Sequence, residues 1–123
     1  MMNRRLNICL LVIVVLFLTA CSSNPKGHNL PISVQSDPLG AYVLLQIHNP
    51  NATNNKDWIF VGNTQVTFTR EFHKEVFDQG HSVSIKLVKG GYFSQTKEWS
   101  GESLQKEKEE KGKVFWNPKL VRQ

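Results

Sequence analysis

Apolar and polar residues alternate along most of this chain, and that period of two constrains the fold more than any other feature. From Ala41 to Ile47 every second residue is apolar. Side chains of a strand point alternately to its two faces, so the pattern predicts strands with one buried face. The alternating segments are short and are bounded by residues that favour turns. The candidate strands are 32–36, 41–47, 58–61, 64–70, 81–89, 93–99 and 114–116, with 120–121 beyond Pro118.

Seven short strands suffice for two packed sheets, so the sequence predicts an all-β fold, a small antiparallel β-sandwich. We expect a hairpin-like reversal at 37–40, where Pro38 presets φ and Gly40 allows a positive φ. The apolar side chains expected to point inward and form the core are Ile32, Val34, Val43, Leu45, Ile47, Val66, Phe68, Val83, Ile85 and Leu87.

Near the start of the chain, Arg4 and Arg5 precede a short apolar run, 8–18. As a helix this run is about 16 Å long, well short of the ~30 Å core of a bilayer, so it predicts a cleaved signal and not a permanent span. The run leads into Leu18-Thr19-Ala20-Cys21. These four residues resemble the lipobox of bacterial lipoprotein signal peptides.

The lipobox resemblance implies that the peptidase cuts between Ala20 and Cys21, and that Cys21 is the lipidation site. On that reading 1–20 is the signal peptide, 21–30 is the lipidated N-terminus and a tether, and 31–123 is the folded domain. Long acyl chains on Cys21 would hold the protein to membrane lipid without a protein span. The alternative is an ordinary signal peptide that happens to end near a cysteine.

Ser22 bears on where the protein is sent, and Cys9 bears on whether the mature chain can form a disulfide. Ser22, in place of an aspartate after the lipidated cysteine, implies sorting to the outer membrane, with the body on the periplasmic side. The second cysteine, Cys9, lies in the signal peptide. The mature chain would therefore have no disulfide pair despite an oxidising destination.

A second resemblance concerns the body of the chain. Ser36-Asp37-Pro38-Leu39-Gly40-Ala41, followed by an alternating strand, resembles the motif that names the PEGA domains, with Leu39 in place of glutamate. Phe60-Val61-Gly62-Asn63-Thr64 and Lys89-Gly90-Gly91-Tyr92 resemble later turns of that family, although Gln65 departs from its usual proline. The resemblance covers 30–99 and implies an antiparallel sandwich similar to transthyretin-like domains.

Two inserts interrupt the strand pattern. The Asn-rich segment 48–57 predicts an exposed loop. The charged insert 102–113 has opposite charges four residues apart, which favours a helix, although a charged hairpin is the alternative. If it is a helix, Ser100 caps its start, Gly112 ends it, and Leu104 alone packs on the body.

The densest group of polar side chains lies in 70–81 and suggests a metal site. The side chains that would point the same way on a strand are Glu71, His73 and Glu75. Because Arg70 and Lys74 compete nearby and no histidine pair has helical spacing, we expect no metal and no other cofactor. The apolar residues of this segment favour packing on the core instead, and they are Phe72, Val76 and Phe77.

Catalytic residues are not expected either, because the chain lacks a serine in a glycine-flanked elbow, a free mature thiol and a phosphate-binding glycine loop. The aromatic residues late in the chain either fill the core or form a surface for a sugar or a protein. They are Tyr92, Phe93, Trp99, Phe115 and Trp116, and core packing is favoured for them and for Trp58.

The charge of the chain argues against one class of partner. The formal net charge is +5, or 5 − 2 = +3 without the two signal-peptide arginines, and the lysines are interspersed with acidic residues. Nucleic acid is therefore not an expected partner. We expect a lipid-anchored periplasmic protein whose non-catalytic module binds an envelope protein or a glycan. The alternative is a pilot or scaffold subunit of a secretion or envelope assembly, and an enzyme comes third.

Overall fold

The computed structural model describes residues 28–53 and 57–123. The predicted signal peptide, Cys21 and most of the tether lie outside these residues. Within them, neither helix has the length and apolar character needed to cross a membrane. The elements are β1 (His28–Val34), β2 (Tyr42–His48), β3 (Ile59–Asn63), β4 (Val66–Phe72), α2 (Lys74–Asp78), β5 (Ser82–Val88), β6 (Gln95–Ser100), α3 (Gly101–Lys111) and β7 (Val114–Trp116).

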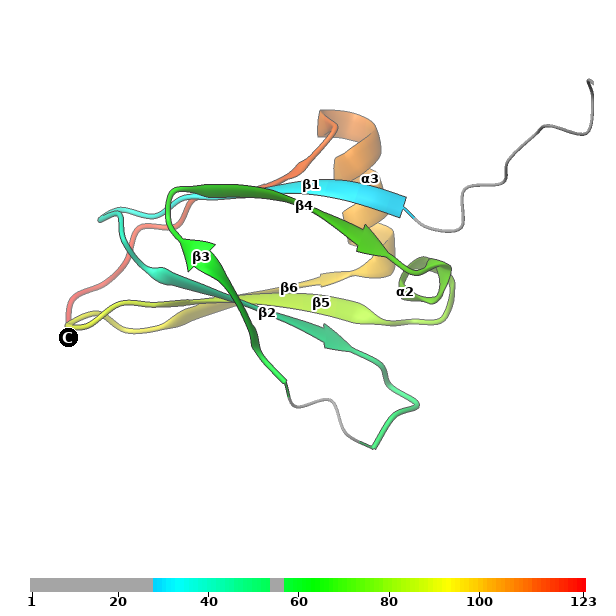
Figure 1. The fold of residues 1–123 in the computed structure, drawn as a ribbon, viewed down its shortest axis with the longest axis horizontal. Coiled ribbons are helices and arrows are strands. Elements are labelled where there is room, and N and C mark those ends of the chain that lie inside the picture. The colour runs from blue at the N-terminus through cyan, green and yellow to red at the C-terminus, as the bar shows by residue number, and fades with distance from the viewer. Residues whose placement is uncertain (1–27, 54–56) are drawn as a thin grey trace, which may run out of the picture.

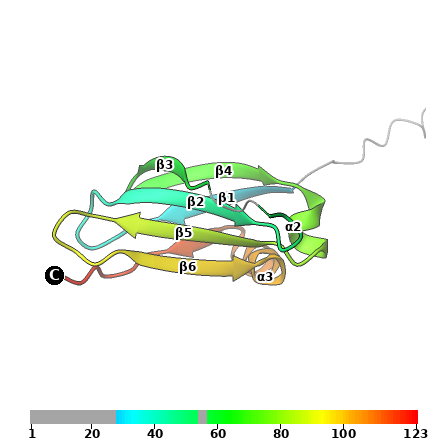
Figure 2. The same ribbon diagram turned by 90° about the horizontal axis from the view of Figure 1, so that it is seen from below.

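The strands form two sheets, as the alternating pattern predicts, and the chain is mostly β (Figure 1). One sheet has the order β4-β1-β7 and the other has the order β3-β2-β5-β6. The expectation of a purely antiparallel sandwich is wrong at one point, because β1 and β7 are parallel. After β6 the chain passes through α3 to the first sheet, and β7 then runs beside β1 in the same direction (Figure 2).

The turn at 37–40 is not the hairpin that its composition suggests. It connects β1 to β2, which belong to different sheets, so it carries the chain across the core. Gly40 has a φ of +92°, a conformation that side chains disfavour. Thr64, at the β3–β4 turn that also changes sheets, accepts hydrogen bonds on its Oγ1 from the Gly40 and Ala41 N–H groups, both at 3.0 Å. The two sheet-changing turns therefore support each other.

The core lies between the two sheets and contains most of the predicted inward set. Seven of the ten predicted residues are buried, and Ile47, Val66 and Phe68 are partly buried against them. The alternation missed residues that lie at strand ends, in helices or near the C-terminus. These additional buried residues are Leu30, Ala41, Phe72, Val76, Trp99, Leu104, Val114 and Leu120.

The charged insert is a helix, α3, which settles the choice between helix and hairpin. The Ser100 Oγ accepts a hydrogen bond from the Ser103 N–H (3.1 Å), as expected of a helix cap. Gly112 ends the helix with a φ of +74°, and its N–H donates to the Lys108 carbonyl (2.8 Å). Leu104 is 1 % exposed and is the apolar side chain through which the helix packs on the body, as predicted.

The polar segment 70–81 is not a continuous strand. β4 ends at Phe72 and is followed by the short helix α2. Phe72 and Val76 are buried, and Phe77 is partly buried with its ring at 90° to that of Phe72. The predicted packing of this segment on the core is therefore confirmed, although five of its residues, 74–78, are helical.

Candidate functional site

The outer surface of the four-stranded sheet carries exposed aromatic side chains, which we call the aromatic face. Tyr42 and Phe60 are 53 % and 56 % exposed, and their ring centroids are 5.8 Å apart at an interplanar angle of 63°. In the strand register Leu44 lies between Phe60 on β3 and Lys86 on β5. The aromatic face is completed by Trp58, whose ring centroid is 5.6 Å from the Lys86 Nζ.

Strand β3 forms the edge of the sheet beside this face, so its outer backbone groups have no strand partner among the described residues. Ile59 and Phe60 are exposed there, and the strand contains no charged residue. The opposite edge, β6, carries Lys97 and Glu98. Charged side chains on an edge discourage pairing with another strand, whereas an apolar edge permits it. Strand β3 is therefore the edge best suited to receive a further strand.

The three residues considered as metal ligands lie around one pocket of about 430 Å³, which we call the Arg70 pocket. Its lining residues are Ile47, Asn49, Arg70, Glu71, Phe72, His73, Glu75, Val76 and His81. Because β4 ends before His73, Glu71, His73 and Glu75 do not share one strand face. Among residues 28–53 and 57–123, no group of three or more His, Cys, Asp or Glu side chains is placed to hold a metal ion.

Two side chains of the Arg70 pocket have buried polar atoms without a hydrogen-bond partner. They are the Arg70 Nε and the His81 Nε2, and His81 is only 9 % exposed. Leaving a buried polar group unpaired costs about 1–3 kcal/mol, and more if the group is charged. Sequence reasoning located this polar cluster but treated Arg70 as a competitor of a metal and not as a binding group.

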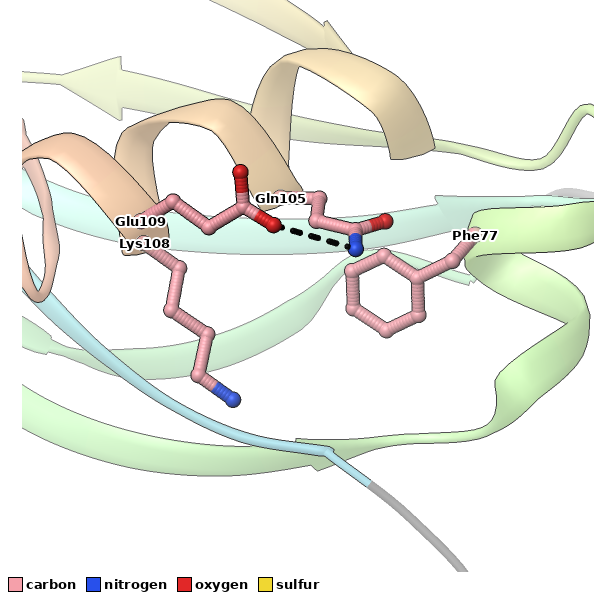
Figure 3. A pocket seen from close by; sticks show the side chains of 4 residues that line it. All are labelled: Phe77, Gln105, Lys108 and Glu109. Atoms are coloured by element: carbon pink, nitrogen blue, oxygen red, sulfur yellow. Dashed lines mark hydrogen bonds between the residues drawn. The ribbon is translucent and has the colours of Figure 1, made fainter.

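A second pocket of about 280 Å³ lies between α2 and α3 and is lined by Phe77, Gln105, Lys108 and Glu109 (Figure 3). The Gln105 Nε2 donates a long hydrogen bond of 3.4 Å to the Glu109 Oε1. Figure 3 shows the Gln105 amide beside the Phe77 ring. The other walls are flexible side chains of an exposed helix, so this pocket lacks the fixed polar groups that orient a ligand.

The aromatic residues near the C-terminal end of the chain, for which core packing was expected, differ in burial. Trp99 is buried, and its ring centroid is 6.0 Å from that of Trp116, which joins the two sheets as core packing predicts. Phe93 and Phe115 are exposed, contrary to the favoured expectation. Trp58 is half-buried and not fully buried, because it lies near the sheet edge with the Lys86 ammonium over its ring.

Sequence reasoning missed the aromatic face, although two signals for it were present. Residues 42 and 44 are apolar on the face of β2 opposite to the core, and 58–61 is apolar without alternation. Both patterns depart from a strand with one polar face. Comparisons with protein-family models, curated proteins and solved structures found no match.

Proposed function

We propose that this chain is a lipoprotein of the bacterial outer membrane, held through acylated Cys21 with its body in the periplasm. Its body is a non-catalytic module that binds an envelope protein through strand β3 and the aromatic face. The lipobox resemblance at 18–21 supports the anchor. The resemblance of 36–41 to the PEGA motif, together with the two β-sheets of the body, supports a PEGA-like or transthyretin-like sandwich.

The observation that carries the binding function is the exposed, uncharged edge of β3. An extended segment of a partner could add to this edge through backbone hydrogen bonds, which provide affinity without requiring a particular sequence. Side chains on one face of that segment would then meet Tyr42 and Phe60, because alternate residues of a strand share a face. Leu44 adds an aliphatic contact, which suits a protein side chain better than a sugar ring.

The same edge would serve a pilot or scaffold subunit of an envelope assembly, because strand addition is a common way to hold an assembly component. The two versions of the function differ in the identity of the partner and not in the surface used. Cross-linking of the lipoprotein in intact cells, followed by mapping of the cross-linked peptides, would identify that partner.

The test of the binding surface is a charge placed on the β3 edge. Phe60→Lys should reduce binding of the identified, purified partner by about tenfold or more, because a lysine on an edge strand opposes pairing and an aromatic anchor is lost. The matched control is Thr96→Lys, an exposed position on β6 at the opposite edge of the same sheet. It should bind as the wild type does.

Three results would contradict this function. Equal loss of binding in the two variants would mean that added charge and not the β3 edge is responsible. Unchanged binding by Phe60→Lys would remove the edge from the interface. Retention of the wild type on cell-wall glycan with no cross-linked protein would assign the aromatic face to a sugar. Circular dichroism of both variants checks that the sheets remain folded.

A further inference from the structure

We propose that the Arg70 pocket binds a small zwitterion: a free amino acid with an aliphatic side chain, or a compound with the same three groups. The carboxylate is held by Arg70, the apolar side chain lies against Phe72 and Val76, and the ammonium group faces the acidic rim of the pocket. This site is separate from the β3 edge and does not depend on the proposed partner.

Arg70 occupies a position of β4 where the alternation of the strand places partly buried and buried side chains. It is flanked at two-residue spacing by Phe68 and Phe72, which pack in the core, and it is paired in register with the buried Leu30. The arginine therefore belongs to the inward face of β4, at the end of the core.

The charge of Arg70 has no counter-ion in the described part of the protein. The ion pair there joins Lys74 to Asp78 on α2 and does not involve Arg70. Arg70 is partly buried and its Nε is shielded from water, and such a group is stabilised when an anion pairs with it. A carboxylate suits the planar fork of the guanidinium group. A bound carboxylate would thus supply the partner that the fold does not.

His81 provides a second polar atom in the same pocket. Its backbone carbonyl accepts a hydrogen bond from the Gly101 N–H (3.2 Å), which fixes the residue at the start of β5. The residue is 9 % exposed, and its Nε2 is buried without a hydrogen-bond partner. His81 lines the same pocket as Arg70, so β4 and the residue just before β5 both contribute an unpaired polar atom to the site.

The size and walls of the pocket restrict the ligand further. A volume of about 430 Å³ lies within the range of small-molecule sites, roughly 300–1,000 Å³. Phe72 and Val76 are buried core residues, and the partly buried Ile47 completes an apolar wall. An aliphatic side chain fits this wall better than a polar one.

The negative charges at the rim of the pocket favour a zwitterion over a simple anion as the ligand. Glu71 and Glu75 line the pocket, are exposed, and form no ion pair among residues 28–53 and 57–123. Their negative charges repel a multiply charged anion such as phosphate and attract a ligand that also carries an ammonium group. Arg70 inside and two carboxylates outside therefore match the charge distribution of an amino acid.

The test uses the full chain purified in mild detergent and a ligand-observed NMR titration with four probes. Leucine carries all three groups, 4-methylpentanoate lacks the ammonium group, leucinamide lacks the carboxylate, and inorganic phosphate lacks the apolar part. We expect leucine to bind with a Kd of about 1 mM, which is ordinary for so small a ligand. 4-Methylpentanoate should bind several-fold more weakly, and leucinamide and phosphate should not saturate.

Two pocket variants and one control separate the contributions. Arg70→Gln should weaken leucine binding by about tenfold or more, because a charge-assisted hydrogen bond is lost. Glu75→Gln, at an exposed position, should reduce the affinity for leucine toward that for 4-methylpentanoate and leave the latter unchanged or improved. Lys74→Gln removes a neighbouring charge that does not line the pocket and should bind leucine normally.

The proposal is overturned if leucine shows no saturable binding up to about 10 mM. Equal affinities for leucine and leucinamide, or binding of phosphate alone, would exclude the zwitterion. Normal leucine binding by a folded Arg70→Gln variant would exclude Arg70 as the carboxylate partner. If that variant does not fold, the Glu75→Gln result and the four-probe comparison on the wild type still decide the outcome.

Discussion

Gly101 shows how one residue sets the spacing between two elements. It lies where β6 ends and α3 begins, and its N–H donates to the His81 carbonyl (3.2 Å). A Cβ atom there would overlap the Val76 carbonyl oxygen and lie 2.8 Å from the Phe77 Cα. Both obstacles are backbone atoms of α2, so they cannot move aside as a side chain could. The absence of a side chain, and not an unusual φ, makes glycine necessary here.

We predict that Gly101→Ala destabilises the fold by about 1–3 kcal/mol or more, because α2 and α3 must separate to admit the methyl group. Urea denaturation followed by circular dichroism measures the change. Gly90→Ala is the control, since nothing lies within 4 Å of its Cβ position, and it should change stability by less than about 0.5 kcal/mol. Equal midpoints for the two variants would mean that α2 moves freely.

At the scale of elements, α3 is a charged helix held to the body at few points. The buried Leu104 packs in the core, and the Trp99 Nε1 on β6 donates to the Glu107 Oε1 (3.3 Å). Most of its other side chains are exposed. A helix of this length is only marginally stable by propensity alone, and α3 has little apolar surface to pack. Its position therefore depends on these contacts.

Leu104→Ala should therefore cost about 2–5 kcal/mol of unfolding free energy, the range for removing a buried leucine side chain. Lys106→Ala, two residues along the same helix and exposed, should stay within about 0.5 kcal/mol of the wild type. Thermal unfolding followed at two wavelengths, one reporting the helix and one reporting tryptophan, measures both changes. A small effect of Leu104→Ala would show that the core closes without α3.

Elements with a local signal were predictable from the sequence, and those determined by distant contacts were not. The alternation in 41–47 and 81–89 marks β2 and β5, and the spacing of charges marks α3. The turn at 37–40 has the same composition whether it makes a hairpin or crosses between sheets, so its crossing could not be predicted. In 70–81, polar and apolar residues suit a strand or a helix, and α2 was missed.

Features of the candidate site were likewise predictable where they depend on neighbouring residues and unpredictable where they depend on the fold. The polar residues of the Arg70 pocket are close in sequence, so their grouping was predictable. The role of Arg70 was not, because it depends on which face of β4 meets the core. Exposure of Tyr42 and Phe60 depends on β3 being an edge strand, and strand order is a property of the whole fold.

At the scale of the whole molecule, the body is closed at the end opposite to the start of β1 (Figure 1). The C-terminal segment bridges both sheets there, through backbone pairs of Asp37 with Lys119 and of Tyr92 with Arg122. The Arg122 Nε also donates to the Tyr92 hydroxyl (3.4 Å), and this hydrogen bond raises the pKa of Arg122 above its ordinary value. The end at which the proposed tether enters is thus distinct from the end closed by the C-terminus.

We expect this arrangement to separate anchoring from folding, because the buried core of residues 28–53 and 57–123 runs from Leu30 to Leu120 and both sheets are built from strands within these residues. Cys21→Ser should therefore keep the β-sheet circular dichroism and the urea midpoint of the wild type, yet disappear from the outer-membrane fraction. Mass spectrometry of the mature wild-type N-terminus should find acyl chains on Cys21. Loss of the β-sheet signal would make Cys21 a structural residue, whereas an unchanged outer-membrane fraction would place the anchor elsewhere in the chain.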